Sequence, residues 1–301
     1  MTADATGHPP VDPSGLTPPP PPRQRAGRNL PAAIAVGVSL VAVLAVGLLL
    51  IDWVFVLLVA VGLSLGAWEV CGAVARLGMR PARIPVVVGT ALIVLVTYLS
   101  PALPTTLGST GVMLAVIGLT MIAALVWRMP QGPDGFVRDA ASSLFVIAYV
   151  PLLGSFASLM IAHPDGPERV LTFVLIVVAG DLFGYAVGLP FGKHQMSPTI
   201  SPKKSWEGFA GSLVGGMLVG VICSIWLLDS RWWVGLVLGV ALVLVGVCGD
   251  LVESLIKRDV GIKDMSSILP GHGGVMDRLD SLLLAAPVAW VLTTLLVPPV
   301  A

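Results

Sequence analysis

Long apolar runs recur along this chain and restrict what it can fold into. Each run has roughly 17–25 residues, the length that an α-helix needs to cross the hydrocarbon core of a bilayer. Hydrocarbon offers no water to backbone polar groups, so such runs form helices. Apolar residues make up 56% of the chain and charged residues 11%, against about 25% charged residues in a soluble domain. We therefore predict an all-α, polytopic integral membrane protein, because a soluble helical core would need polar helix faces that these runs lack.

About nine transmembrane helices are expected. Residues 1–29 differ in composition, with prolines at positions 9, 10, 13 and 18–22, and predict a disordered, Pro-rich cytoplasmic tail. We divide the rest into N-terminal transmembrane helices (30–165) and a C-terminal transmembrane catalytic region (166–301). The expected spans are 31–50, 53–72, 84–100, 108–127, 140–162, 169–190, 206–228, 232–256 and 281–298.

Lys and Arg residues are distributed unevenly between the two sides of the predicted membrane. Of the 17 Lys and Arg residues, only Arg169 and Arg231 lie on one side of the predicted membrane. The other 15 lie on the opposite side. Because positive charge is enriched in cytoplasmic connections, the N-terminus is predicted to be cytoplasmic and the C-terminus external. Two unusually polar segments, 188–208 and 254–280, then face the cytoplasm. Connections in the N-terminal half are short and Arg-bearing, so chemistry is expected from about residue 180 onward.

Acidic residues near the predicted span ends are candidate functional groups. Asp181 lies well inside an apolar run, where a carboxylate is costly unless it is paired, metal-bound or facing water. A structural pairing with a basic residue is the alternative. Asp250 and Glu253 share one helix face by their spacing of three, and Asp277 and Asp280 repeat that spacing. Two converging carboxylate pairs could hold Mg²⁺, which favours carboxylate and phosphate oxygens, although solvated helix ends often carry similar pairs.

Basic residues interleave with these acids. Excess carboxylates alone would suggest a cation pathway, whereas carboxylates mixed with Lys and Arg suggest phosphate bound together with Mg²⁺. Glycines in the segment 270–274 (PGHGG) permit close backbone approach and could present N–H groups to phosphate oxygens; a plain turn is the alternative. The basic residues concerned are Lys203, Lys204, Lys257, Arg258, Lys263 and Arg278.

The segment 254–280, SLIKRDVGIKDMSSILPGHGGVMDRLD, resembles the signature of the phosphatidate cytidylyltransferase (CDP-diacylglycerol synthase) family. A second block is similar as well, in Gly192-Lys193-His194 and in SPKKSWEG at 201–208, and so is Asp181 with the glycine and tyrosine that follow it. The resemblance covers about residues 175–285. Two departures occur: Leu182 and Phe183 follow the acid where the family has a small polar residue, and Ser205 stands where Thr is common.

The resemblance implies transfer of CMP from CTP to phosphatidic acid, giving CDP-diacylglycerol and pyrophosphate, with Mg²⁺ and in some cases a second cation as cofactors. Catalytic roles are implied for Asp250, Asp277, Lys263 and Asp264. Metal ligation is implied for Asp250 and Asp277 and expected also for Glu253 and Asp280. Substrate-binding roles are expected for Asp181, Ser201, Lys203, Lys204, Glu207, Lys257, Arg258, His272 and Arg278. Of these, His272 is interpreted as a hydrogen-bond donor to a phosphate or as part of a turn.

The expected partners are CTP, phosphatidic acid and membrane lipid, with no nucleic acid. The predicted location is the plasma membrane, with the active site facing the cytoplasm. Homodimerisation is compatible with the small-xxx-small pairs Gly62/Gly66, Gly211/Gly215 and Gly216/Gly220, although these pairs serve packing within one chain equally well.

Two alternatives to this function stay open. The same CTP-dependent chemistry could act on another lipid phosphate or on a polyprenol. Apolar helix faces bind the lipid tail, and the polar motifs do not indicate which tail these faces bind. A transporter would also explain intramembrane acids, but transporters often show two repeated halves. Here the polar motifs are confined to one half of the chain, which disfavours a transporter.

Overall fold

The computed structural model of the protein describes residues 47, 48, 50–269 and 273–298. The predicted tail at 1–29, most of the predicted span 31–50, and His272 lie outside these residues. Everything that follows concerns the described part of the chain.

Within that part, eight helical segments are long and apolar enough to cross a membrane, and they coincide with the eight predicted spans from 53–72 onward. The prediction of an all-α polytopic membrane protein is thereby confirmed. The main helices are α2 (Asp52–Ala75), α3 (Arg83–Leu99), α4 (Gly108–Arg128), α5 (Phe136–Ile147), α6 (Phe156–Ile161), α7 (Gly166–Phe191), α8 (Trp206–Trp226), α9 (Trp232–Val260) and α10 (Met276–Leu296), with short helical turns η1 (Ser100–Ala102) and η2 (Met129–Gln131).

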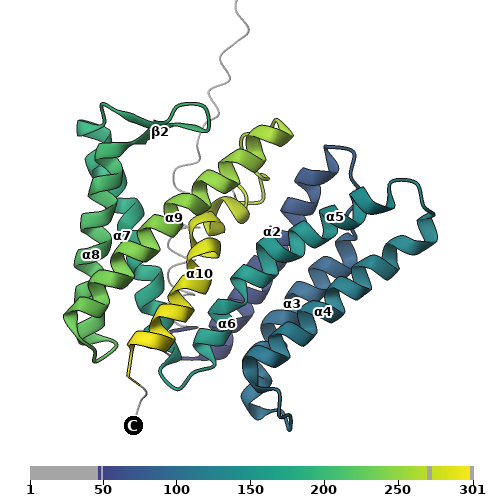
Figure 1. The fold of residues 1–301 in the computed structure, drawn as a ribbon, viewed down its shortest axis with the longest axis horizontal. Helices are drawn as coiled ribbons and strands as arrows, with labels where there is room; N and C mark the ends of the chain where they lie inside the picture. The colour runs from purple at the N-terminus through teal and green to yellow at the C-terminus, as the bar shows by residue number, and fades with distance from the viewer. Residues whose placement is uncertain (1–46, 49, 270–272, 299–301) are drawn as a thin grey trace, which may run out of the picture.

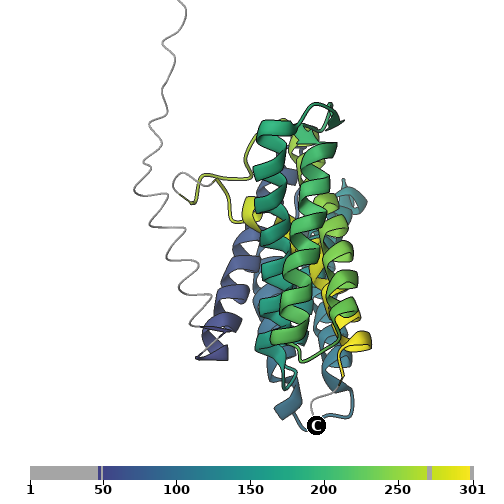
Figure 2. The same cartoon turned by 90° about the vertical axis from the view of Figure 1, so that its left-hand side faces the viewer.

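Successive helices run up and down and form two neighbouring groups (Figure 1). Helices α2 to α5 pack one against the next, and so do α7 to α10. Helix α10 joins the groups because it contacts α2 and α6 as well as α7 and α9. Helices α7 and α8 stand side by side and α9 runs obliquely to them (Figure 1), and the C-terminal end of α10 lies opposite the connection between α7 and α8 (Figure 2). The first residue of α7, Gly166, adjoins the predicted division at residue 165, which stays a prediction.

The predicted span 140–162 is not one continuous α-helix. A π-helical segment, η3 (Ala148–Leu152), separates α5 from α6 and contains Pro151. Proline lacks a backbone N–H and its ring crowds the carbonyl four residues earlier, so a regular α-helix cannot pass through it unchanged. The wider π turn accommodates the proline ring.

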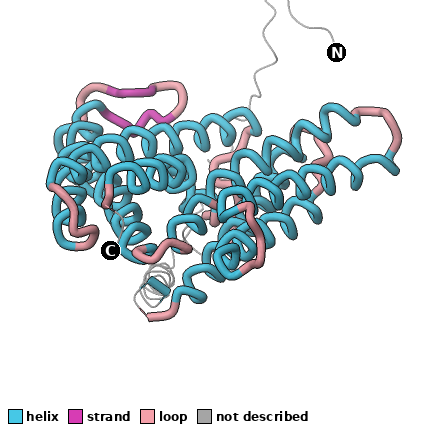
Figure 3. The backbone as a smooth tube through the Cα atoms, turned by 60° about the horizontal axis from the view of Figure 1, so that its bottom comes forward, coloured by secondary structure: helices cyan, strands magenta, loops and turns pink. Residues whose placement is uncertain are grey.

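A short β-hairpin closes one end of the bundle between α7 and α8 (Figure 3). Its strands are β1 (Gln195–Ser197) and β2 (Ser201–Ser205), paired antiparallel. The last strand leads directly into α8, where the Ser205 hydroxyl accepts a hydrogen bond of 3.1 Å from the Gly208 N–H. This hydrogen bond is an ordinary N-cap, so a serine hydroxyl is sufficient at the position where Thr is common. The hairpin thereby fixes the basic residues of β2 to the start of a membrane helix.

Glycines bring α7, α8 and α9 into close contact. A β-carbon at Gly215 would lie 2.5 Å from the Phe183 ring of α7, and one at Gly220 would lie 2.3 Å from the Gly235 carbonyl oxygen of α9. The other glycines of the two small-xxx-small pairs of α8 also pack within the chain. Gly211 lies against Val187 of α7, and Gly216 lies against Val243 of α9. The small-xxx-small pairs of α8 therefore serve packing within one chain, and homodimerisation stays a prediction without their support.

We expect Gly220→Ala to destabilise the protein. The added methyl group would meet the Gly235 carbonyl oxygen, and overpacking of this kind costs about 1–3 kcal/mol. Thermal unfolding of the detergent-purified protein should show a lower midpoint than wild type. Gly118→Ala on α4 is the matched control, because a β-carbon there has nothing within 4 Å; equal midpoints for the two variants would contradict the close α8–α9 contact.

Candidate active site

A cavity of about 640 Å³ opens beneath the β-hairpin, between α7, α8 and α9. Ligand pockets in proteins measure about 300–1,000 Å³, so a nucleotide-sized molecule can enter. Five of the predicted site residues line this cavity: Asp181, Ser201, Lys203, Lys204 and Asp250. They come from three elements, α7, β2 and α9, and only the packing of these elements brings them together.

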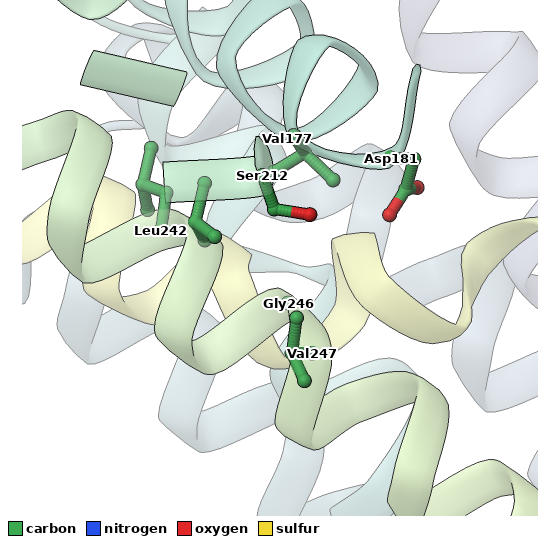
Figure 4. Close-up of a pocket in the computed structure, with 8 residues that line it drawn as sticks. Val177, Asp181, Ser212, Leu242, Gly246 and Val247 are labelled. Atoms are coloured by element: carbon green, nitrogen blue, oxygen red, sulfur yellow. The ribbon is translucent and has the colours of Figure 1, made fainter. Parts of the chain in front are cut away.

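Asp181 is exposed rather than buried in the apolar bundle. Its carboxylate lies at the border between the large cavity and a narrow pocket lined by Ser212 and Val177 (Figure 4). The side chain carries its charge toward a polar space shared with Lys204, as expected for a carboxylate at this depth in a membrane protein. The prediction that this acid faces water or a partner is consistent with its position.

Lys204 connects the cavity with the acidic residues of α9. Its ammonium nitrogen lies 2.5 Å from Asp250 Oδ2, and both side chains are only partly exposed. A half-buried pair of this kind is screened less by salt than a surface pair. The cavity therefore has a cation and an anion in contact at its inner edge.

Three carboxylates converge next to this ion pair. Oxygen atoms of Asp250, Glu253 and Asp280, the acidic trio, lie within 4.8 Å of one another. The first two stand on one face of α9, and Asp280 reaches them from the first turns of α10. This close approach depends on Gly249, where a β-carbon would lie only 2.4 Å from the Asp280 carbonyl oxygen. The glycine beside Asp250 thus allows α10 to bring its acid to α9.

The acidic trio suits a hard divalent cation. Glu253 is fully buried, and neither of its carboxylate oxygens has a hydrogen-bond partner in the described structure, although the Lys257 ammonium contacts one of them. A fully buried carboxylate with a single cationic partner is costly, and a cation bound by oxygen ligands would lower that cost. The donor set is all oxygen, as Mg²⁺ prefers, so the three residues that could hold such an ion are those of the trio.

Asp277, predicted as a metal ligand, lies outside the acidic trio. One of its oxygens accepts a hydrogen bond of 2.8 Å from Lys257 Nζ, and the other accepts from the backbone N–H groups of Met265 (2.9 Å) and Gly274 (2.8 Å). In this conformation its carboxylate organises the connection between α9 and α10. Its metal role stays a prediction.

Glu69 of α2 was missed by the sequence analysis. It is 3% exposed and accepts hydrogen bonds from Met276 N (2.7 Å), Val275 N (3.0 Å) and the Ser266 hydroxyl (2.5 Å). Backbone N–H groups at the start of a helix have no intrahelical partner, and here a carboxylate from a distant helix satisfies them. A lone acid inside an apolar run, the signal that singled out Asp181, would have found it.

Comparison with known proteins agrees with this arrangement. Residues 31–296 match the cytidylyltransferase family. This chain belongs to that family. A phosphatidate cytidylyltransferase of Mycobacterium leprae is 43% identical over 288 residues, which cover 90% of both chains. One from Mycobacterium tuberculosis is 41% identical over 285 residues, covering 90% of this chain and 84% of the relative. One from Staphylococcus saprophyticus is 39% identical over 155 residues, covering 51% of this chain and 59% of the relative. The resemblance drawn from the motifs is confirmed.

The remaining predicted residues that the structure describes lie around the rim of the same end of this cytidylyltransferase. Glu207 accepts hydrogen bonds from the backbone N–H groups of Lys193 and His194, both at 3.2 Å, and so closes the base of the hairpin. Arg258 Nε donates to the Ile200 carbonyl at 3.4 Å, which ties the end of α9 to the hairpin. The other described residues of the set, all exposed, are Lys263, Asp264 and Arg278.

Replacing Glu69 by Gln should loosen the start of α10 in this cytidylyltransferase. The amide keeps one acceptor oxygen, but its NH₂ group faces the N–H groups of Val275 or Met276, so at least one hydrogen bond to a charged group is lost, worth about 1.5–3 kcal/mol. Backbone amides in 262–276 should exchange with solvent at least about 10-fold faster by mass spectrometry. Asp52→Asn, at the other end of α2, is the control; unchanged protection in the Glu69 variant would exclude the anchoring role.

Proposed function

We propose that this cytidylyltransferase transfers CMP from CTP to phosphatidic acid and releases pyrophosphate. The cavity under the hairpin carries the proposal, because it brings basic residues of β2 together with Asp250, one member of the acidic trio. Two phosphorylated substrates need cationic donors, and their reacting groups need charge neutralisation. Membership of the family and the names of the similar mycobacterial and staphylococcal proteins support phosphatidic acid as the acceptor.

The reaction is a displacement at the α-phosphorus of CTP. An oxygen of the lipid phosphate forms the new P–O bond, the bond to the oxygen that bridges the α- and β-phosphorus atoms breaks, and pyrophosphate leaves with the electron pair. The attacking phosphate is already anionic, so no side chain has to act as a strong base. The protein contributes by positioning the two substrates and by neutralising charge.

Lys203 and Lys204 are proposed to bind substrate phosphates in the cavity, with Ser201 and Asp181 beside them. Lys204 contacts Asp250 in the structure and can donate to a phosphate oxygen at the same inner edge. Mg²⁺ held by the acidic trio would neutralise charge on the phosphates. Asp277, Lys263 and Asp264 are proposed to take part through the connection between α9 and α10. The other residues proposed to contact substrate are Glu207, Lys257, Arg258, His272 and Arg278.

A plasma-membrane location with the site at the cytoplasmic face is part of the proposal. The uneven distribution of Lys and Arg supports this orientation, and CTP is a soluble cytoplasmic nucleotide. Apolar side chains of α7 that border the cavity, Tyr185 and Leu189, are 69% and 73% exposed. They offer the lipid tails an apolar surface next to the site of transfer.

The proposal is tested with the purified protein in detergent, phosphatidic acid, Mg²⁺ and CTP labelled at either the α- or the γ-phosphorus. Label from the α-position should enter the lipid, and label from the γ-position should not. Transfer of γ-label to a polyprenol would instead show a kinase, and α-label transferred only to another lipid phosphate would change the acceptor. Absence of transfer to any lipid would favour the transporter.

Asp250→Asn should lower turnover at least about 100-fold, because it removes one charge from the trio and the partner of Lys204. Asp229→Asn is the matched control. It lies in the connection at the opposite end of the bundle, at a positive φ of 43° that asparagine adopts readily. Near-normal turnover of the Asp250 variant would remove Asp250 from the catalytic site.

A further inference from the structure

The carboxylate of Glu69 lies directly against the backbone of Gly274, in the connection that leads into α10. A β-carbon at Gly274 would lie 2.8 Å from Glu69 Oε2 and 2.9 Å from Oε1, well inside an ordinary van der Waals distance. Gly274, unlike Gly273, does not have a positive φ, so its backbone conformation does not require glycine. Glycine is required at position 274 because the carboxylate from α2 fills the space of a side chain.

Three donors hold the Glu69 carboxylate in this position. Oε1 accepts hydrogen bonds from the Ser266 hydroxyl and the Val275 N–H, and Oε2 accepts from the Met276 N–H. These backbone N–H groups have no partner within α10, because they stand at its start. If the carboxylate turned away from Gly274, a buried charge and a buried N–H would both lose their partners, which is costly.

The same face of α2 packs against the first turns of α10. Gly62, Gly66 and Glu69 share one side of α2 by their helical spacing. A β-carbon at Gly66 would lie 3.6 Å from Met276 Sδ and 4.0 Å from Leu279 Cδ1, and Met276 is fully buried. The carboxylate of Glu69 therefore completes a continuous contact between α2 and the start of α10.

This contact bears on the acidic trio, because Asp280 stands one helical turn after Met276 on α10. One of its oxygens lies within 4.8 Å of oxygens of the two trio members on α9. Metal–ligand distances in proteins vary by only about 0.2 Å, so the start of α10 has to be held in place. Lys257 holds it from the α9 side, through a hydrogen bond of 2.8 Å to Asp277, and Glu69 holds it from the α2 side.

We propose that Glu69 is a positioning residue for the cation site, because its carboxylate, seated against Gly274, holds α10 where Asp280 completes the acidic trio. The inference rests on the cation role of the trio in the proposed function. It gives the N-terminal half of the chain a part in the reaction, through a residue that touches neither substrate nor cation. Residues that orient metal ligands typically change metal affinity 10–100-fold when they are replaced.

The test is a Mn²⁺ titration of the purified full-length protein, monitored by electron paramagnetic resonance. Glu69→Gln should raise the Mn²⁺ dissociation constant about 10-fold. The Mg²⁺ concentration for half-maximal CMP transfer should rise in parallel, with the rate largely restored at saturating Mg²⁺. Gly274→Ala keeps the N–H that Asp277 accepts but displaces the Glu69 carboxylate, so it should weaken Mn²⁺ binding to a similar extent.

The variant that carries both changes distinguishes one shared contact from two separate effects. Both substitutions disturb the same carboxylate, so the double variant should bind Mn²⁺ about as tightly as the weaker of the two single variants. Independent effects would multiply instead. Gly220→Ala is the control for lost stability, because its contact with Gly235 lies several helical turns before Asp250 on α9. It should bind Mn²⁺ as wild type does.

Equal Mn²⁺ affinity in wild type and Glu69→Gln would overturn the inference, and so would an equal loss of affinity in Gly220→Ala or effects that multiply in the double variant. Absence of saturable Mn²⁺ binding to a wild type that still transfers CMP would also overturn it, while the proposed function stands. Weaker Mn²⁺ binding by the Glu69 variant, in a protein that makes no CDP-diacylglycerol, would uphold the positioning role while the proposed acceptor fails.

Discussion

Charge inside an apolar bundle has to be paired, and this constraint organises the whole structure. Lys257 lies between Glu253 and Asp277, and Lys204 contacts Asp250. In the N-terminal half, Arg128 and Asp139 form a buried pair at 2.9 Å. Removing one member of such a pair leaves an uncompensated buried charge, which is strongly destabilising. The paired charges therefore fix the helix ends relative to one another, which contacts between apolar helix faces alone would not do.

The connection between α9 and α10 depends on carboxylates from two directions. Asp277 binds it from within, through Met265 and Gly274, and Glu69 binds it from α2, through Val275 and Met276. The first helix group is thus more than a membrane anchor, because it supplies the acceptors that fix the start of α10. Any movement of α2 relative to α10 would displace Asp280 and so alter the acidic trio.

Much of the site could be anticipated from spacing alone. Asp250 and Glu253 share a helix face because they are three residues apart, and the structure brings Asp280, from the second predicted pair, next to them. Asp277 was harder, because spacing cannot tell a carboxylate that binds a cation from one that binds backbone N–H groups. Glu69 comes from a helix with no recognisable motif, and its relation to the site exists only across the helix packing.

The sequence by itself determined the membrane class, the eight described spans and the acidic and basic residues available for chemistry, because helix formation in hydrocarbon depends on local composition. Only the tertiary structure decided which of those residues meet. Gly249 lets α10 approach α9 closely, and the hairpin sets Lys204 against Asp250. These contacts join residues far apart along the chain, and their geometry follows from side-chain packing between helices, which no local pattern encodes.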